Sequence, residues 1–154
     1  EIPLDPEAAV QATRDGYVDV ILAQQNPDGG WSLGGGASDP DLTAMALQAL
    51  AGYRSRTDVS ASADAGLSCL AQMQQEDGAF LSWGAESSES VSQVLVALTA
   101  LGLSPDDARF VKNGQTLEEA TPQIERILRE PKLQERFREY SEQLRKRAVV
   151  EIRQ

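Results

Sequence analysis

A seven-residue segment that occurs twice is the feature that most constrains what this chain can fold into. The two copies, residues 25–31 and 74–80, read QNPDGGW and QQEDGAF, and their aspartates, Asp28 and Asp77, lie 49 positions apart. Each copy stands between apolar stretches that have the spacing of a helix. A fixed period of this length is typical of repeats in which one helical unit cannot bury its apolar face alone and packs on the next. We therefore predict two stacked helical hairpin repeats.

The residue types that the copies share are those of a corner between two helices. Glycine after aspartate accepts a positive φ, the aspartate accepts hydrogen bonds from nearby backbone N–H groups, and the aromatic ring covers the turn. The glutamine can satisfy peptide groups at a neighbouring helix end. This structural motif comprises Gln25, Asp28, Gly29, Trp31, Gln74, Asp77, Gly78 and Phe80. The alternative role of Trp31 and Phe80 is to form an aromatic wall for a ligand.

Capping patterns and apolar spacing predict about six helices. Asp5-Pro6 and Asp39-Pro40 each place a capping side chain before a proline at the first helical position. They open helices over about residues 6–25 and 40–51, linked loosely by the glycines at 34–36. A third helix is expected over about 58–75, and a fourth contains the residues from 91 to 101, apolar on nearly every side and therefore expected to be buried. A short helical turn near 105–110 and a turn at 112–114 follow.

The composition changes at about residue 116, where we place a domain boundary. Residues 1–116 form the predicted repeat domain, and residues 117–154 form a C-terminal helical extension. Thr116 and Glu119 have the spacing of a capping box, and two helices are expected over about 117–129 and from Pro131 to the end. The last helix carries an apolar stripe, which must cover either the open end of this chain or a partner.

Charge and composition exclude several classes of function. The net charge of −10 disfavours nucleic acid and anionic membrane surfaces as partners, and no apolar run is long enough to span a bilayer. The chain has no histidine and a single cysteine, Cys69, so we expect no metal site and no cofactor. Leu67 and Leu70 flank Cys69, which predicts a buried thiol. The start of the chain has no recognisable signal peptide.

The repeated segment resembles the α/α-toroid superfamily of terpene cyclases, protein prenyltransferases, complement thioester domains and cobalamin-carrying proteins. Residues 25–31 match the QxxDGxW motif of the cyclases, and residues 74–80 match it with phenylalanine for tryptophan. Residues 39–50 and 89–102 are similar to prenyltransferase-like repeats of bacterial secreted and surface proteins. The resemblance covers about residues 6–117 and implies an all-α fold, a partial α/α toroid, in a secreted or cell-surface protein. The tail is not matched.

The resemblance also supplies one catalytic candidate. Residues 39–44, DPDLTA, are similar to the DxDDTA acid motif of class II terpene cyclases, whose proton-donating aspartate corresponds to Asp41, with Asp39 beside it. Leu42 replaces the third aspartate, and aromatic residues make up only 5% of the chain. A structural interpretation is that Asp39 caps a helix and Asp41 complements its dipole. We favour that interpretation, and the prenyltransferase zinc ligands and the thioester motif are absent.

Three functional hypotheses follow. The leading one is a non-catalytic repeat module that binds a protein or small ligand, or serves as a scaffold. Its candidate contact residues are Trp31, Trp83, Glu86 and Glu89, and acidic residues at helix starts leave calcium open as a ligand. The second is a terpene-cyclase-like enzyme with Asp41 as general acid. The third is a structural or engineered self-assembly protein acting through residues 117–154, and two copies could close a ring as a homodimer.

Overall fold

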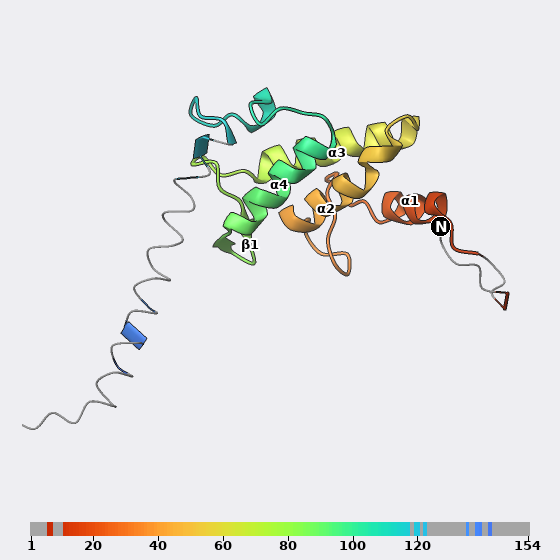
Figure 1. Ribbon diagram of the computed structural model, residues 1–154, viewed down its shortest axis with the longest axis horizontal. Helices are drawn as coiled ribbons and strands as arrows, with labels where there is room; N and C mark the ends of the chain where they lie inside the picture. The colour runs from red at the N-terminus through yellow and green to blue at the C-terminus, as the bar shows by residue number, and fades with distance from the viewer. Residues whose placement is uncertain are drawn as a thin grey trace, which may run out of the picture.

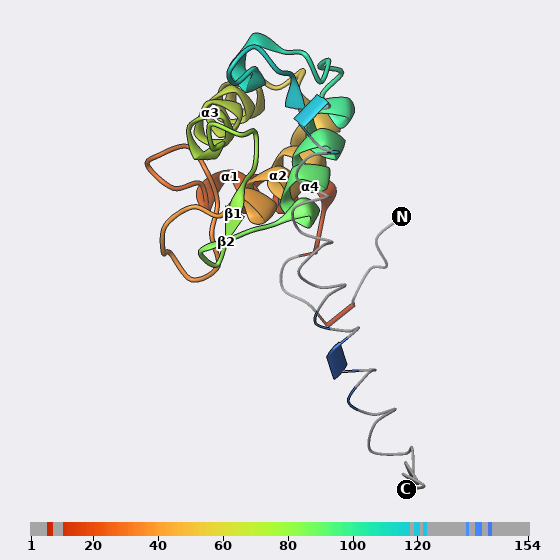
Figure 2. The same ribbon diagram turned by 90° about the vertical axis from the view of Figure 1, so that its left-hand side faces the viewer.

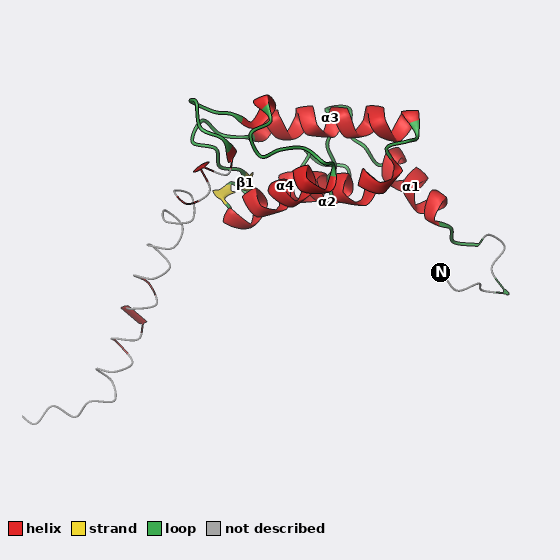
Figure 3. Cartoon of the chain, turned by 45° about the horizontal axis from the view of Figure 1, so that its top comes forward, coloured by secondary structure: helices red, strands yellow, loops and turns green. Residues whose placement is uncertain are grey.

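The computed structural model describes residues 6–7, 11–117, 119–120, 122, 135, 138–139 and 142. The described part contains four α-helices, two short 3₁₀ helices and one two-stranded hairpin (Figure 1). Helix α3 lies along one side, and helices α2 and α4 lie together along the other (Figure 3). Helix α2 packs against both α3 and α4 and so occupies the centre of the arrangement. The predicted all-α character is confirmed, whereas the predicted number of six helices and the closure into a partial toroid are not established.

The first helix begins later than its sequence pattern predicts. Helix α1 spans Arg14–Ala23, whereas residues 6–7 form a turn and residues 11–13 are not helical. Thr13 has an extended backbone, and its Oγ1 accepts a hydrogen bond from the Gly16 N–H at 3.0 Å. Threonine is a preferred N-cap residue, so a cap at Thr13 sets the start of this helix. The predicted cap at Asp5 lies outside the described residues.

The start of the second helix confirms its prediction. Helix α2 spans Pro40–Leu50, and Asp39 Oδ1 accepts from the N–H groups of Asp41 and Leu42 at 2.9 and 3.1 Å. A short 3₁₀ helix, η1 (Ala51–Tyr53), follows where the helix was expected to stop. Helix α3 spans Thr57–Met73, close to the predicted range.

A β-hairpin that the sequence pattern did not indicate precedes the fourth helix. Strands β1 (Leu81–Ser82) and β2 (Ala85–Glu86) pair antiparallel, as Figure 2 shows. Trp83 and Gly84 connect them with φ values of 53° and 81°, which is the backbone of a type I′ turn. Helix α4 then spans Ser88–Ala100. It was expected to be buried on nearly every side, yet Val96 is 53% exposed, because only one face of α4 packs against α2.

The described chain after α4 begins with turns. The 3₁₀ helix η2 spans Ala108–Phe110, and an isolated bridge joins Lys112 to Gln115 around the predicted turn. The Thr116 N–H donates to Glu119 Oε2 at 2.9 Å, and the Glu119 N–H donates to Thr116 Oγ1 at 3.2 Å. These two bonds confirm the predicted capping box. The two helices predicted after it, with the apolar stripe of the second, fall almost entirely outside the described residues.

One hydrophobic cluster connects all the described helices. Its fully buried members include Leu47 of α2, Leu67 of α3 and Leu98 of α4. Leu117 and Ala120, which are 0% and 2% exposed, belong to the same cluster. The core therefore continues past residue 116, the last residue of the predicted repeat domain.

Candidate functional site

The first repeated segment, corner 1 (residues 25–31), is a closed turn. The Asn26 N–H donates to Gly30 O at 2.8 Å, and the Gly29 N–H donates to Asn26 O at 2.9 Å. Asp28 Oδ1 accepts from the Gly30 N–H at 3.1 Å. Gly29 has a φ of 89°, and a Cβ atom there would lie 2.7 Å from the Ala65 carbonyl oxygen in α3. Only glycine fits this corner, for both reasons.

The second repeated segment, corner 2 (residues 74–80), repeats these contacts bond for bond. The Gln75 N–H donates to Ala79 O at 2.8 Å, and the Gly78 N–H donates to Gln75 O at 3.0 Å. Asp77 Oδ1 accepts from the Ala79 N–H at 3.0 Å, and Gly78 has a φ of 88°. Asp28 and Asp77 thus make the same contact within their corners, and both carboxylates brace a turn.

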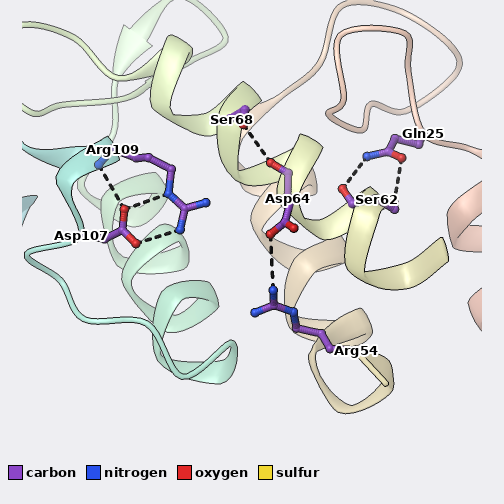
Figure 4. Close-up of polar contacts among 7 residues, drawn as sticks. All are labelled: Gln25, Arg54, Ser62, Asp64, Ser68, Asp107 and Arg109. Atoms are coloured by element: carbon purple, nitrogen blue, oxygen red, sulfur yellow. Dashed lines mark hydrogen bonds and ion pairs between the residues drawn. The ribbon is translucent and has the colours of Figure 1, made fainter. Parts of the chain in front are cut away.

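The two glutamines link each corner to a later segment of the chain. Gln25 Nε2 donates to Gly29 O at 2.7 Å and to Ser62 O in α3 at 2.9 Å (Figure 4). Gln74 Nε2 donates to Gly78 O at 3.4 Å and to Phe110 O in η2 at 3.3 Å. Each glutamine therefore joins its own corner to a helical element beyond the next α-helix, 37 residues later for Gln25 and 36 residues later for Gln74.

The two aromatic residues of the motif belong to the core. Trp31 is 5% exposed and its indole N–H donates to Ile21 O at 2.7 Å, while Phe80 is fully buried. The carbonyl groups of both residues accept from the N-cap residue of the next helix, Asp39 at 2.9 Å and Ser87 at 3.1 Å. These contacts make Trp31 a structural residue of corner 1, and its burial leaves little of its side chain accessible to a ligand.

The segment after corner 1 is held in place by polar side chains. Asn26 Nδ2 donates to Ser38 Oγ at 2.9 Å and to Ser32 Oγ at 3.1 Å, and Ser32 Oγ donates to Gly36 O at 2.9 Å. Ser38 Oγ donates to Asp28 Oδ1 at 2.6 Å, and this bond, followed by that from the Gly30 N–H, lowers the pKa of Asp28. The glycine link, predicted to be loose, is therefore anchored at Gly36.

The thiol of Cys69 faces this polar network from α3. Cys69 is 4% exposed, as predicted, and burial, aided by the negative charge of Asp28, raises its pKa. A Cβ atom at Gly30 would lie 2.8 Å from Cys69 Sγ. The thiol therefore fills space beneath corner 1, and a neutral thiol of this kind is a poor nucleophile.

A groove of about 590 Å³ opens where the loop after corner 1, the start of α2 and the hairpin meet. Its volume falls within the range of ligand pockets, about 300–1,000 Å³. Its walls are mostly apolar, and it is open to solvent. The residues that line this groove are Ser32, Leu33, Gly36, Ala37, Ser38, Asp39, Pro40, Asp41, Leu42, Leu81 and Trp83.

Trp83 is the most exposed large apolar residue at the groove. It is 97% exposed, and Leu33 on the opposite segment is 79% exposed. Its φ of 53° lies in the left-handed region, where a bulky aromatic residue costs about 1 kcal/mol or more. Because the side chain is almost fully exposed, its burial does not offset the cost of this conformation. Trp83 is therefore a candidate for contact with a binding partner.

Asp41 contributes a carboxylate to the same groove. Its Oδ2 accepts from Ser82 Oγ in β1 at 3.2 Å, and its Oδ1 is buried with no hydrogen-bond partner among the described residues. The neighbouring Asp39 uses its Oδ1 to cap α2. The sequence thus identified Trp83 and Asp41 separately, but it gave no sign that the hairpin brings Ser82 to Asp41.

The other predicted contact residues lie outside the groove wall. Glu86 ends β2, and Glu89 lies in the first turn of α4. Glu89 Oε2 accepts from Ser88 Oγ at 3.2 Å. In the part of the chain that the structure describes, no group of three or more acidic, cysteine or histidine residues could hold a metal ion.

Comparison of the chain with family models, curated proteins and solved structures finds no match. Among the described residues, no helix is long and apolar enough to cross a bilayer.

Proposed function

We propose that this chain is a non-catalytic helical repeat module that binds a partner in the groove beneath Trp83. The observation that carries this proposal is the exposure of Trp83 at a positive φ beside a groove of about 590 Å³. Tryptophan is enriched at binding hot spots, where the contacts around it contribute little energy but exclude water. Leu33, Leu42 and Leu81 are apolar residues that line the groove with Trp83.

The equivalence of the two corners supports an α/α-toroid-like repeat as the scaffold of this module. Both corners use the same backbone bonds, the same aspartate contact and a glycine at nearly the same φ. The resemblance to repeats of bacterial secreted and surface proteins makes such a protein the proposed context.

The openness of the groove favours binding over terpene-cyclase chemistry. Protonation of an alkene requires a dry cavity that protects the cationic intermediate from water. Among the described residues of the groove wall, Trp83 is the only aromatic one, and it is 97% exposed. Asp41 therefore lacks the enclosure and the aromatic neighbours that a general acid of this type needs.

A peptide-library selection tests the proposal. A displayed library of random dodecapeptides is selected on the wild-type protein and each clone is compared with Trp83→Asn, which keeps the turn. The control variant is Val96→Asn, which removes another exposed apolar side chain, outside the groove wall. We expect clones that lose at least tenfold in affinity on Trp83→Asn and keep it on Val96→Asn. A selection that yields no such clones contradicts the proposal.

A further inference from the structure

The described residues of the groove wall carry only negative charge. Among them are the carboxylates of Asp39 and Asp41 and no lysine or arginine. The chain as a whole carries a net charge of −10. A charged group that enters this groove therefore meets a negative potential, which favours a cation and repels an anion.

Neither groove carboxylate forms an ion pair with a described residue. Four other aspartates do: Arg56 pairs with Asp19 and Asp58, each at 2.7 Å, and Arg54 pairs with Asp64 at 3.4 Å. Figure 4 shows the pair of Asp107 and Arg109, at 2.8 Å. Within the described residues, the arginines of these ion pairs therefore do not compensate the charge of the groove.

Among the described residues, Asp41 lacks a hydrogen-bond donor at one of its two carboxylate oxygens. One oxygen has only the hydroxyl of Ser82 as a donor, and the other is shielded from solvent with no donor. A carboxylate oxygen that has lost water without gaining a donor is poorly stabilised. A cation beside Asp41 would supply the missing electrostatic compensation.

We propose, building on the binding function proposed above, that the groove takes a protein segment presenting a lysine or arginine next to an apolar side chain. The basic group lies against Asp41, and the apolar side chain packs between Leu33, Leu81 and Trp83. The stem of a lysine or arginine packs on apolar surface while its charge reaches the carboxylate. The indole face of Trp83 adds a cation–π surface.

Three labelled octapeptides in a Gly/Ser frame test this assignment by fluorescence polarisation. Their central triplets are Leu-Lys-Leu, Leu-norleucine-Leu and Leu-Glu-Leu, so that only the charge of the middle side chain changes. We expect the lysine peptide to bind at least tenfold more tightly than the norleucine peptide, and the glutamate peptide to bind most weakly. Raising the salt concentration should weaken only the lysine peptide substantially.

Variants separate this inference from the binding function itself. Asp41→Asn should lower the affinity for the lysine peptide to that of the norleucine peptide and leave the norleucine peptide unchanged. The matched control, Asp106→Asn, removes the same charge from an exposed position beyond the far end of α4 and should preserve the preference. Equal binding of lysine and norleucine peptides, lost in Trp83→Asn, would overturn the charge assignment and leave the groove as a binding site. Binding unaffected by Trp83→Asn would overturn both proposals.

Discussion

Gln25 and Ser62 bond to each other in both directions, with Gln25 Nε2 donating to Ser62 O at 2.9 Å and Ser62 Oγ donating to Gln25 Oε1 at 2.7 Å. The pair, shown in Figure 4, joins corner 1 to the middle of α3, 37 residues later in the chain. Gln74 at the equivalent position of corner 2 has longer bonds and a buried Oε1 with no partner among the described residues. Gln25 of corner 1 therefore makes more and shorter hydrogen bonds than Gln74 of corner 2.

Replacement of the two glutamines by methionine should have unequal effects. Gln25→Met removes three short hydrogen bonds and should lower the free energy of unfolding by about 2 kcal/mol. Gln74→Met removes two bonds of 3.3–3.4 Å and also an unpaired acceptor, so its cost should stay below about 1 kcal/mol. Urea unfolding measures both, with the exposed Gln24→Met as control. Equal costs would contradict the unequal bonding of the corners.

Alanine at the corner glycines should destabilise the fold. Gly29→Ala places a Cβ atom 2.7 Å from a backbone oxygen at a φ of 89°, which should cost about 3 kcal/mol. Gly78→Ala meets Ala120 Cβ at 2.6 Å and should be similarly costly. Gly52→Ala, where a Cβ atom meets nothing within 4 Å, is the control and should be neutral or slightly stabilising. Thermal unfolding ranks the three variants, and a harmless Gly78→Ala would rule out the close contact with Ala120.

Substitution at the hairpin turn should separate stability from binding. Asparagine followed by glycine is a preferred type I′ sequence, so Trp83→Asn should raise the free energy of unfolding by up to about 1 kcal/mol. Little burial is lost because Trp83 is 97% exposed. The same variant should lose affinity for the peptides. A marked loss of stability on denaturation would instead mean that Trp83 serves the fold.

The ion pair of Asp107 and Arg109 predicts a loss of stability in acid. The hydrogen bonds from the Arg109 guanidinium lower the pKa of Asp107 from 3.8 to about 2. Because the folded-state pKa lies below the unfolded one, the stabilisation is complete above about pH 4 and disappears as the pH falls toward about 2. Because both side chains are partly exposed to solvent, which screens the charges, we expect the ion pair to contribute about 1 kcal/mol to the free energy of unfolding.

Denaturation of Asp107→Asn and of the wild type across that pH range measures this contribution. The difference in stability between them should shrink as the pH falls from 4 to 2, apart from the part due to the N-cap bond that Asp107 makes to the Arg109 N–H. A difference that stays constant with pH would mean that the ion pair adds no stability.

The sequence predicted features that depend on neighbouring residues. The cap at Asp39, the capping box at Thr116 and the turns at Gly29 and Gly78 all follow from local residue types and were placed correctly. The hairpin was missed because tryptophan at a positive φ contradicts local preference, so Trp83 and Gly84 did not read as a turn.

The groove could not be predicted from the residue types of neighbouring positions. It forms only because β1 packs beside α2, which brings Ser82 to Asp41 across 41 residues of sequence. The same holds for the contact of Gly78 with Ala120, which draws residues after 116 into the core. These relationships depend on how the helices stack, which residue spacing within one repeat does not determine.

Amide chemical-shift mapping with the Leu-Lys-Leu peptide shows directly whether the peptide binds in the groove. The isotope-labelled protein is titrated with the peptide and its backbone resonances are followed by NMR. We expect saturable shifts concentrated in residues 32–42 and 81–84, with the corner residues Gly29 and Gly78 unchanged. Shifts spread evenly over the acidic surface, or centred on the exposed face of α1, would contradict it.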